Sequence, residues 1–198
     1  MMPKEIRDYH IQALVQLARR SGAGDARPIS AKDIRVKEEL ARFCRDPQCD
    51  QYGLAAGCPP HVSGPAGFRK LQTEYTEALV IKIDVPTGVL FSDERRGIMK
   101  LLHEGVAAVE QAAVRMGYKR SRGFAGGSCK PLFCFEDADC RVVSGRGGCR
   151  HPLSARPSMS GFGIDVGELM RVAGWSGEMA DSETDSEMTW VAGLVLIG

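Results

Sequence analysis

The chain has 198 residues, enough to bury a hydrophobic core in one domain but too few for two large independent domains. Its 26 basic and 25 acidic residues give a net charge of +1, so the charge does not predict nucleic-acid binding. No apolar run reaches the length of about 18 residues that a membrane span needs, and residues 1–10 are charged rather than hydrophobic. We therefore expect a cytoplasmic protein that binds neither membranes nor nucleic acid.

The N-terminal third of the chain combines one clear helix with a long loop. Apolar residues at helical spacing predict an amphipathic helix over 5–20. Residues 21–28 are rich in Gly, Ala and Pro and predict a break, followed by a short strand over 34–36 and a turn of helix over 38–43. Residues 44–65 then form a first cysteine-bearing loop, which is rich in Pro and Gly.

The middle of the chain predicts a strand, a long helix and a second strand. The apolar run 78–85 is typical of a buried strand, and the apolar stripe of 92–116 predicts a helix with Ser92 as its N-cap. A short strand is expected over 120–125. This order is that of a crossover unit, in which a helix connects two parallel strands.

The last third contains a second cysteine-bearing loop, 126–157, and two further elements. Asp165 stands at the N-cap position of a helix predicted over 166–173. Residues 177–187 are polar and acidic and predict a solvated connection, whereas the apolar run 190–197 predicts a buried final strand. A hydrophobic strand so near the terminus is also a candidate for pairing with a second subunit in a homodimer.

These elements together predict an α+β (or α/β) fold. We expect a small mixed sheet with flanking helices and two long cysteine-bearing loops, within a single metal-binding domain over 1–198. The sequence contains no phosphate-binding or dinucleotide-binding glycine motif and no nucleophile-elbow serine motif.

Seven cysteines are the most informative feature of the sequence. Disulfides are rare in the cytosol, and an odd number of thiols cannot pair completely, so metal binding or redox chemistry is the main interpretation. The cysteines divide into a three-cysteine group and a four-cysteine group, one in each predicted loop. The groups are Cys44, Cys49 and Cys58, and then Cys129, Cys134, Cys140 and Cys149.

The spacing of these cysteines favours iron–sulfur clusters over zinc. No two of them have the two-residue gap common in structural zinc sites, and a long loop with four thiols can surround a four-iron cluster. Pro59 after Cys58 is similar to the Cys-Pro ending of bacterial ferredoxin runs. Zinc is the alternative cofactor, and each cysteine taken alone is also compatible with a small buried hydrophobe.

The division into four and three thiols predicts one [4Fe–4S] cluster and leaves a second one open. The four-cysteine group can ligate every iron of a cluster. The three-cysteine group has one thiolate too few, so it binds a second cluster with a non-cysteine ligand or an open iron, or it binds no metal. His61 is the nearest candidate for a fourth ligand, although a surface position is the commoner role for a loop histidine.

Basic residues after Cys149 are candidates for substrate binding. Arg150, His151 and Arg156 lie close together in the sequence and would offset the charge of a thiolate cluster or hold an anionic substrate. A solvated basic loop is the alternative. His103, on the predicted long helix, is expected to be a structural or surface histidine rather than a ligand.

Several short motifs together resemble a known bacterial and archaeal family. They are Cys44…Cys49…Tyr52-Gly53…Cys58-Pro59-Pro60, Gly127-Ser128-Cys129, CRHP at 149–152, ARPSM at 155–159 and GIDV at 163–166. This combination is similar to domain of unknown function 2284, a family of predicted metal-binding proteins, over about residues 34–175. The resemblance implies metal binding through an iron–sulfur cluster in anaerobes or facultative anaerobes, and it implies no particular reaction.

The sequence leaves three functions open. The one we expect is electron transfer or redox chemistry through a cluster in the four-cysteine group, with a larger redox partner protein. The second is an enzyme with an open-iron [4Fe–4S] cluster in the three-cysteine group, acting as a lyase or desulfidase on a small anionic substrate. The third is a structural zinc-binding module.

Overall fold

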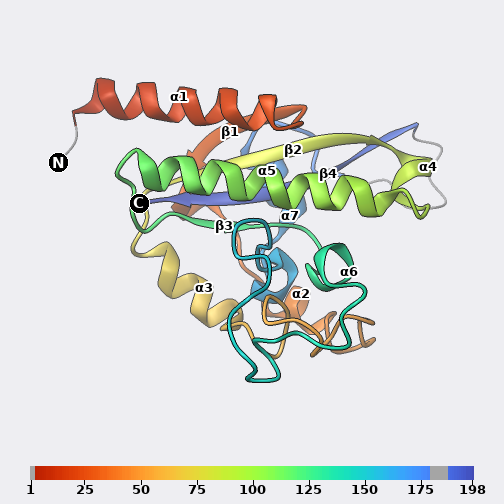
Figure 1. Cartoon of the computed structure of the whole chain (residues 1–198). Coiled ribbons are helices and arrows are strands. Elements are labelled where there is room, and N and C mark those ends of the chain that lie inside the picture. The colour runs from red at the N-terminus through yellow and green to blue at the C-terminus, as the bar shows by residue number, and fades with distance from the viewer. Residues whose placement is uncertain (1–2, 179–186) are drawn as a thin grey trace.

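The computed structural model describes residues 3–178 and 187–198 and has the α+β fold that the sequence predicts (Figure 1). Part of the predicted connection 177–187, residues 179–186, lies outside the described residues. The elements in chain order are α1 (Lys4–Arg20), β1 (Asp25–Ser30), the 3-10 helix η1 (Ala31–Asp33), α2 (Glu38–Arg42), α3 (Gly64–Gln72), β2 (Glu77–Pro86), α4 (Thr87–Leu90), α5 (Arg95–Arg115), β3 (Arg122–Phe124), α6 (Lys130–Phe133), the 3-10 helix η2 (Met159–Phe162), α7 (Val166–Val172) and β4 (Met188–Ile197).

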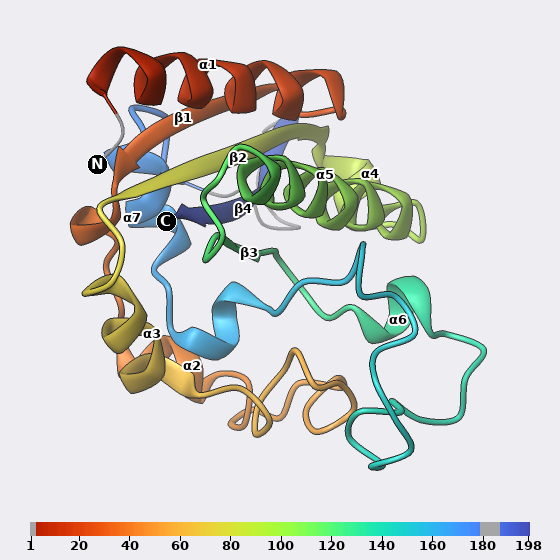
Figure 2. The same cartoon turned by 60° about the vertical axis from the view of Figure 1, so that its left-hand side comes forward.

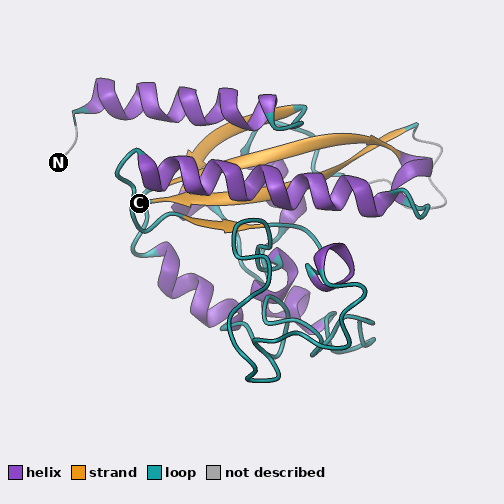
Figure 3. Ribbon diagram, viewed as in Figure 1, coloured by secondary structure: helices purple, strands orange, loops and turns teal. Residues whose placement is uncertain are grey.

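Four strands of the described chain form one antiparallel sheet in the order β1-β2-β4-β3 (Figure 3). Both β2 and β3 are antiparallel to β4, so they run parallel to each other on either side of it. The helix α5 connects them, which confirms the predicted crossover unit. The expected mixed sheet is nevertheless corrected to an antiparallel one, because β4 lies between the two parallel strands and pairs with both.

The sheet is covered on both faces, and alternate residues of its central strands belong to two hydrophobic cores (Figure 2). Leu79 and Ile81 of β2 pack with α1 and α5, and Val195 of β4 lies opposite Leu79. Val80 of β2 and its partner Leu194 of β4 pack on the other side with α3, η2 and α7. Burial on both faces explains why these strands read as near-continuous apolar runs.

Gly193 allows α5 to pack directly on β4. A Cβ atom at this position would clash with Cγ2 of Val106 in α5, so any larger residue would push the helix away. The same helix carries His103 and Glu110, whose side chains bond to the second cysteine-bearing loop and its edge. The contact at Gly193 therefore also sets the position of that loop.

The N-terminal predictions are partly wrong. The predicted break 21–28 overlaps β1, and Pro28 is tolerated there because β1 is an edge strand that pairs with β2 alone. The strand expected over 34–36 is reduced to an isolated bridge between Val36 and Ile164.

Local chemistry sets where two of the helices begin. Asp165 Oδ1 accepts a hydrogen bond from the Glu168 N–H at 3.0 Å, which confirms the predicted cap of α7. In contrast, α5 begins at Arg95, later than expected. The Ser92 hydroxyl accepts from the Glu94 N–H at 3.2 Å, so it stabilises the turn before the helix rather than the helix itself.

The position of β4 removes the reason for expecting a homodimer through the final strand. This strand lies inside the sheet between β2 and β3, and its hydrophobic side chains are buried in the two cores. Formation of a homodimer stays a prediction. Among the described helices, none has the length and apolar character needed to cross a membrane.

Candidate metal centre

The two cysteine-bearing loops lie side by side below β3 in the views of Figures 1 and 2. The segment around Ser158 joins them, because it forms a parallel bridge with Ala125 and its N–H donates to the Gly57 carbonyl at 2.9 Å. A Cβ atom at Gly57 would lie 3.1 Å from Cα of Pro157, so glycine permits this close approach. The backbone therefore holds both groups of thiols at the same end of the molecule.

The four-cysteine group surrounds a small cavity of about 20 Å³. Cys129, Cys134, Cys140 and Cys149 all line it, although they span much of the second loop. Burial, and then the charges of neighbouring thiolates that include Cys58, raise the pKa of Cys129 to about 12. This thiol is therefore protonated in the metal-free protein, and a bound metal would have to displace its proton.

Two cations fold the second loop around this cavity. The Lys130 ammonium donates to the carbonyls of Cys134 at 2.7 Å and Asp137 at 2.6 Å. Arg150 forms an ion pair with Asp137 at 3.2 Å and donates to the Asp139 carbonyl at 3.1 Å. These contacts close a loop that has little regular structure of its own, and the four cysteines line one cavity within it.

Cys140 lies in the environment that most favours a thiolate. Burial acts against its ionisation, but three backbone amides and the Arg150 charge outweigh burial, so the pKa of Cys140 lies below its usual value. The amides are those of Val143, Ala56 and Val142. Cys149 also accepts a hydrogen bond, from the His151 N–H at 3.3 Å.

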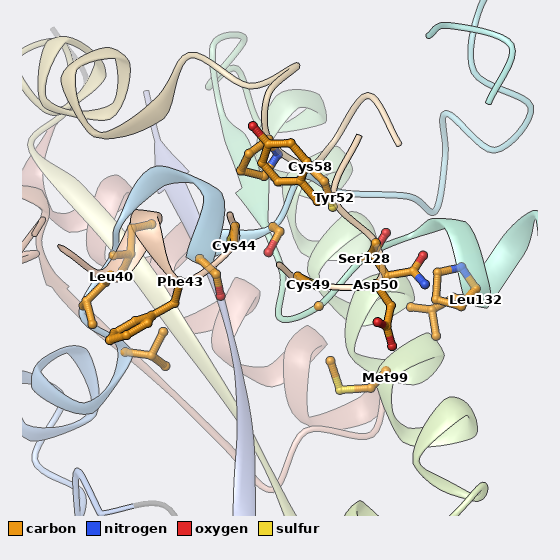
Figure 4. A pocket seen from close by; sticks show the side chains of 18 of the residues that line it. Leu40, Phe43, Cys44, Cys49, Asp50, Tyr52, Cys58, Met99, Ser128 and Leu132 are labelled. Carbon is orange, nitrogen blue, oxygen red and sulfur yellow. The ribbon is translucent and has the colours of Figure 1, made fainter. Parts of the chain in front are cut away.

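The three-cysteine group lines a much larger hollow of about 970 Å³, here called the cysteine pocket (Figure 4). Cys58 is buried, Cys44 is half-buried and Cys49 is exposed. Burial, and then the charges of the other two thiolates, raise the pKa of Cys44. Apolar side chains close the pocket on two sides, and those labelled in Figure 4 are Leu40, Phe43, Met99 and Leu132.

Ser128 connects the two groups of thiols. Its hydroxyl bonds to the Cys58 thiol and partly offsets the effect of burial, which raises the pKa of Cys58. It also precedes Cys129 in the chain, and its Oγ accepts from the Lys130 N–H at 3.3 Å. The charge of Cys58 is also among the influences that raise the pKa of Cys129, so these two thiols of different groups lie near each other.

The two cavities differ in the size of the group that they can hold. Among residues 3–178 and 187–198, no three His, Cys, Asp or Glu side chains lie close enough together to hold one metal ion. The cysteine pocket has room for a multi-atom group. The smaller cavity holds about one water molecule, and the segment 141–150 beside it, which includes Cys149, is exposed.

The basic residues predicted to bind substrate separate into two roles. Arg150 and His151 line the cavity of the four-cysteine group, and the His151 ring packs against Phe133 with centroids 5.6 Å apart. Arg156 is only 7% exposed, and its guanidinium forms an ion pair with Glu110 at 2.7 Å. This residue lines neither the cavity of the four-cysteine group nor the cysteine pocket. The structure thus gives Arg156 the role of anchoring the loop to α5.

His103 and His61, unlike His151, do not line either thiol site. His103 is fully buried, its Nδ1 accepts from the Arg156 N–H at 3.2 Å, and its Nε2 donates to the Gly126 carbonyl at 3.0 Å. Burial lowers the pKa of His103 to about 4, so the ring is neutral near pH 7 and structural, as expected. His61 is exposed, and its Nε2 lies 3.1 Å from the Gly53 carbonyl rather than in the pocket.

Sequence reasoning missed several residues that line the cysteine pocket. Gln51 follows the second cysteine of its loop, and Arg95 and Arg96 come from the start of α5. No motif singles out these residues, because the fold alone brings α5 beside the first loop.

An α+β fold that carries two groups of thiols in adjoining loops defines the class of this chain, a cysteine-rich metal-binding protein. The sequence matches the family described as "Predicted metal-binding protein (DUF2284)" over residues 27–197, and the chain belongs to that family. This match confirms the resemblance that the short motifs indicate. No curated protein and no protein of solved structure gives a match.

Proposed function

We propose that this protein is an iron–sulfur protein that transfers electrons, with the four-cysteine group as the ligands of a [4Fe–4S] cluster. The observation that carries the proposal is the common cavity of the four thiols, because a cluster needs one thiolate for each iron.

The surroundings of the four thiols support a redox role. The Arg150 guanidinium, the amides at Cys140 and the His151 N–H at Cys149 all place positive charge beside sulfur. Such contacts stabilise the more negative, reduced state of a cluster and raise its reduction potential. Cys149 is exposed, so a partner protein has access to this end of the site.

A redox titration tests this proposal. Protein purified without oxygen is expected to show a reversible one-electron couple, and Arg150→Ala to shift its potential to a more negative value because a positive charge is lost. The control is Arg146→Ala, which removes an exposed arginine of the same loop that pairs with Asp139. A protein with no reversible couple, or equal potentials for both variants and the wild type, would contradict the proposal.

The cysteine pocket favours a second function. In this alternative the protein is an enzyme with an open-iron cluster in the three-cysteine group. Three thiols line a pocket of about 970 Å³, which has room for a small molecule beside an iron that they would hold. Arg95 and Arg96 line this pocket, whereas Arg150 and Arg156 do not. For a lyase or desulfidase that acts on an anionic substrate, Arg95 and Arg96 are therefore the candidate anion-binding residues.

A further inference from the structure

Gln51 carries a buried oxygen that has no hydrogen-bond donor. Its side chain lines the cysteine pocket, and its Oε1 is one of two buried side-chain atoms without a partner among the described residues. The other is His10 Nδ1, on the helix α1 far from the thiols along the chain. An unpartnered buried acceptor is destabilising, so its presence calls for a binding partner.

The three-cysteine group has one ligand too few for a four-iron cluster, and the side-chain oxygen of Gln51 is able to be the fourth. Four irons need four ligands, and Cys44, Cys49 and Cys58 supply three. A carboxamide oxygen is neutral, has two lone pairs and binds metals without losing a proton. His61, the candidate from sequence, does not line the pocket and has its Nε2 at the Gly53 carbonyl.

Asp50 is the other oxygen donor of this segment on the pocket wall, and it is the weaker candidate. It is exposed, and its carboxylate extends toward Met99 (Figure 4). A solvated carboxylate is already satisfied by water, whereas the buried oxygen of Gln51 is not.

We propose that Gln51 Oε1 is the fourth ligand of the three-cysteine site and binds the iron that has no thiolate. This inference rests on the proposal that the site holds a [4Fe–4S] cluster. Iron–sulfur clusters take soft thiolate ligands, so the amide oxygen is the weakest of the four donors. An iron held by Gln51 would be the most readily exchanged of the four, and Gln51 lines the cysteine pocket, which has room for a small molecule.

The test compares cluster conversion in the full-length wild type, Gln51→Ala and Gln51→Cys after anaerobic reconstitution with iron and sulfide. Ferricyanide oxidation releases the weakly held iron, and electron paramagnetic resonance detects the resulting [3Fe–4S] cluster. We expect release about 10-fold faster in Gln51→Ala. We expect slower release and a more negative reduction potential in Gln51→Cys, because a thiolate adds negative charge.

Gln48→Ala is the matched control, because Gln48 is an exposed glutamine of the same loop. Asp50→Asn tests the alternative oxygen ligand. If both Gln51 variants release iron at the wild-type rate, or if Asp50→Asn alone changes that rate, the assignment of Gln51 is wrong while the cluster itself stands. If the wild type forms no cluster that depends on Cys58, the proposed function of this site fails, and the role of Gln51 fails with it.

Discussion

Replacing Cys140 with alanine is expected to remove about half of the iron and labile sulfide that the chain binds. Cys140 is one of four thiols on a common cavity, and its hydrogen bonds and the Arg150 charge favour the thiolate that a metal requires. Loss of this ligand leaves one iron of the cluster without a thiolate. The three-cysteine group keeps its own thiols, so its share of iron and sulfide stays. Iron and sulfide analysis of the reconstituted variant gives the measurement.

The matched control for this change is Ser144→Ala. Ser144 lies in the exposed segment that follows Cys140, and its side chain bonds within the loop without lining the cavity. This variant is expected to bind as much iron as the wild type. Full iron content in Cys140→Ala would show that the four cysteines do not act together as a ligand set.

Replacing Arg156 with alanine is expected to lower the free energy of unfolding by about 3 kcal/mol, because breaking a buried ion pair leaves an uncompensated charge. The Arg156 side chain is 7% exposed and its partner Glu110 is 21% exposed. The guanidinium also donates to the carbonyls of Pro152 at 3.1 Å and Ala155 at 2.7 Å. Its loss therefore frees the second loop from α5. Equilibrium unfolding in guanidinium chloride measures the change.

Arg171→Ala provides the comparison, because Arg171 pairs with Glu168 on the surface of α7 at 2.9 Å. An exposed pair of this kind contributes about 0–1 kcal/mol. If Arg156→Ala is as stable as Arg171→Ala, the buried pair does not hold the loop. A substrate-binding role for Arg156, as the sequence suggests, would then regain support.

The elements with strong hydrophobic patterns were predictable from the sequence, and their arrangement was only partly so. The helix α1 and the strands β2 and β4 follow directly from apolar periodicity. The strand β1 was not predictable, because Pro28 marks a break unless the strand lies at a sheet edge. The insertion of β4 between β2 and β3 is a long-range choice that no local pattern encodes.

The candidate site was also only partly predictable from the sequence. The separation of the cysteines into groups of four and three was visible in the sequence, and the structure gives each group its own cavity. The role of Arg156 was not visible, because its partner Glu110 lies 46 residues away on α5. Gln51 was also missed, since a buried oxygen without a donor is recognisable only when side chains are placed.

Iron, zinc and acid-labile sulfide in protein purified without oxygen test the central claim most directly. We predict about eight irons per chain with matching sulfide and almost no zinc, which corresponds to one [4Fe–4S] cluster in each cysteine group. About four irons would limit the claim to a single cluster and remove the open-iron enzyme unless spectroscopy finds a free iron. Zinc without sulfide would contradict the account and leave a structural zinc-binding module.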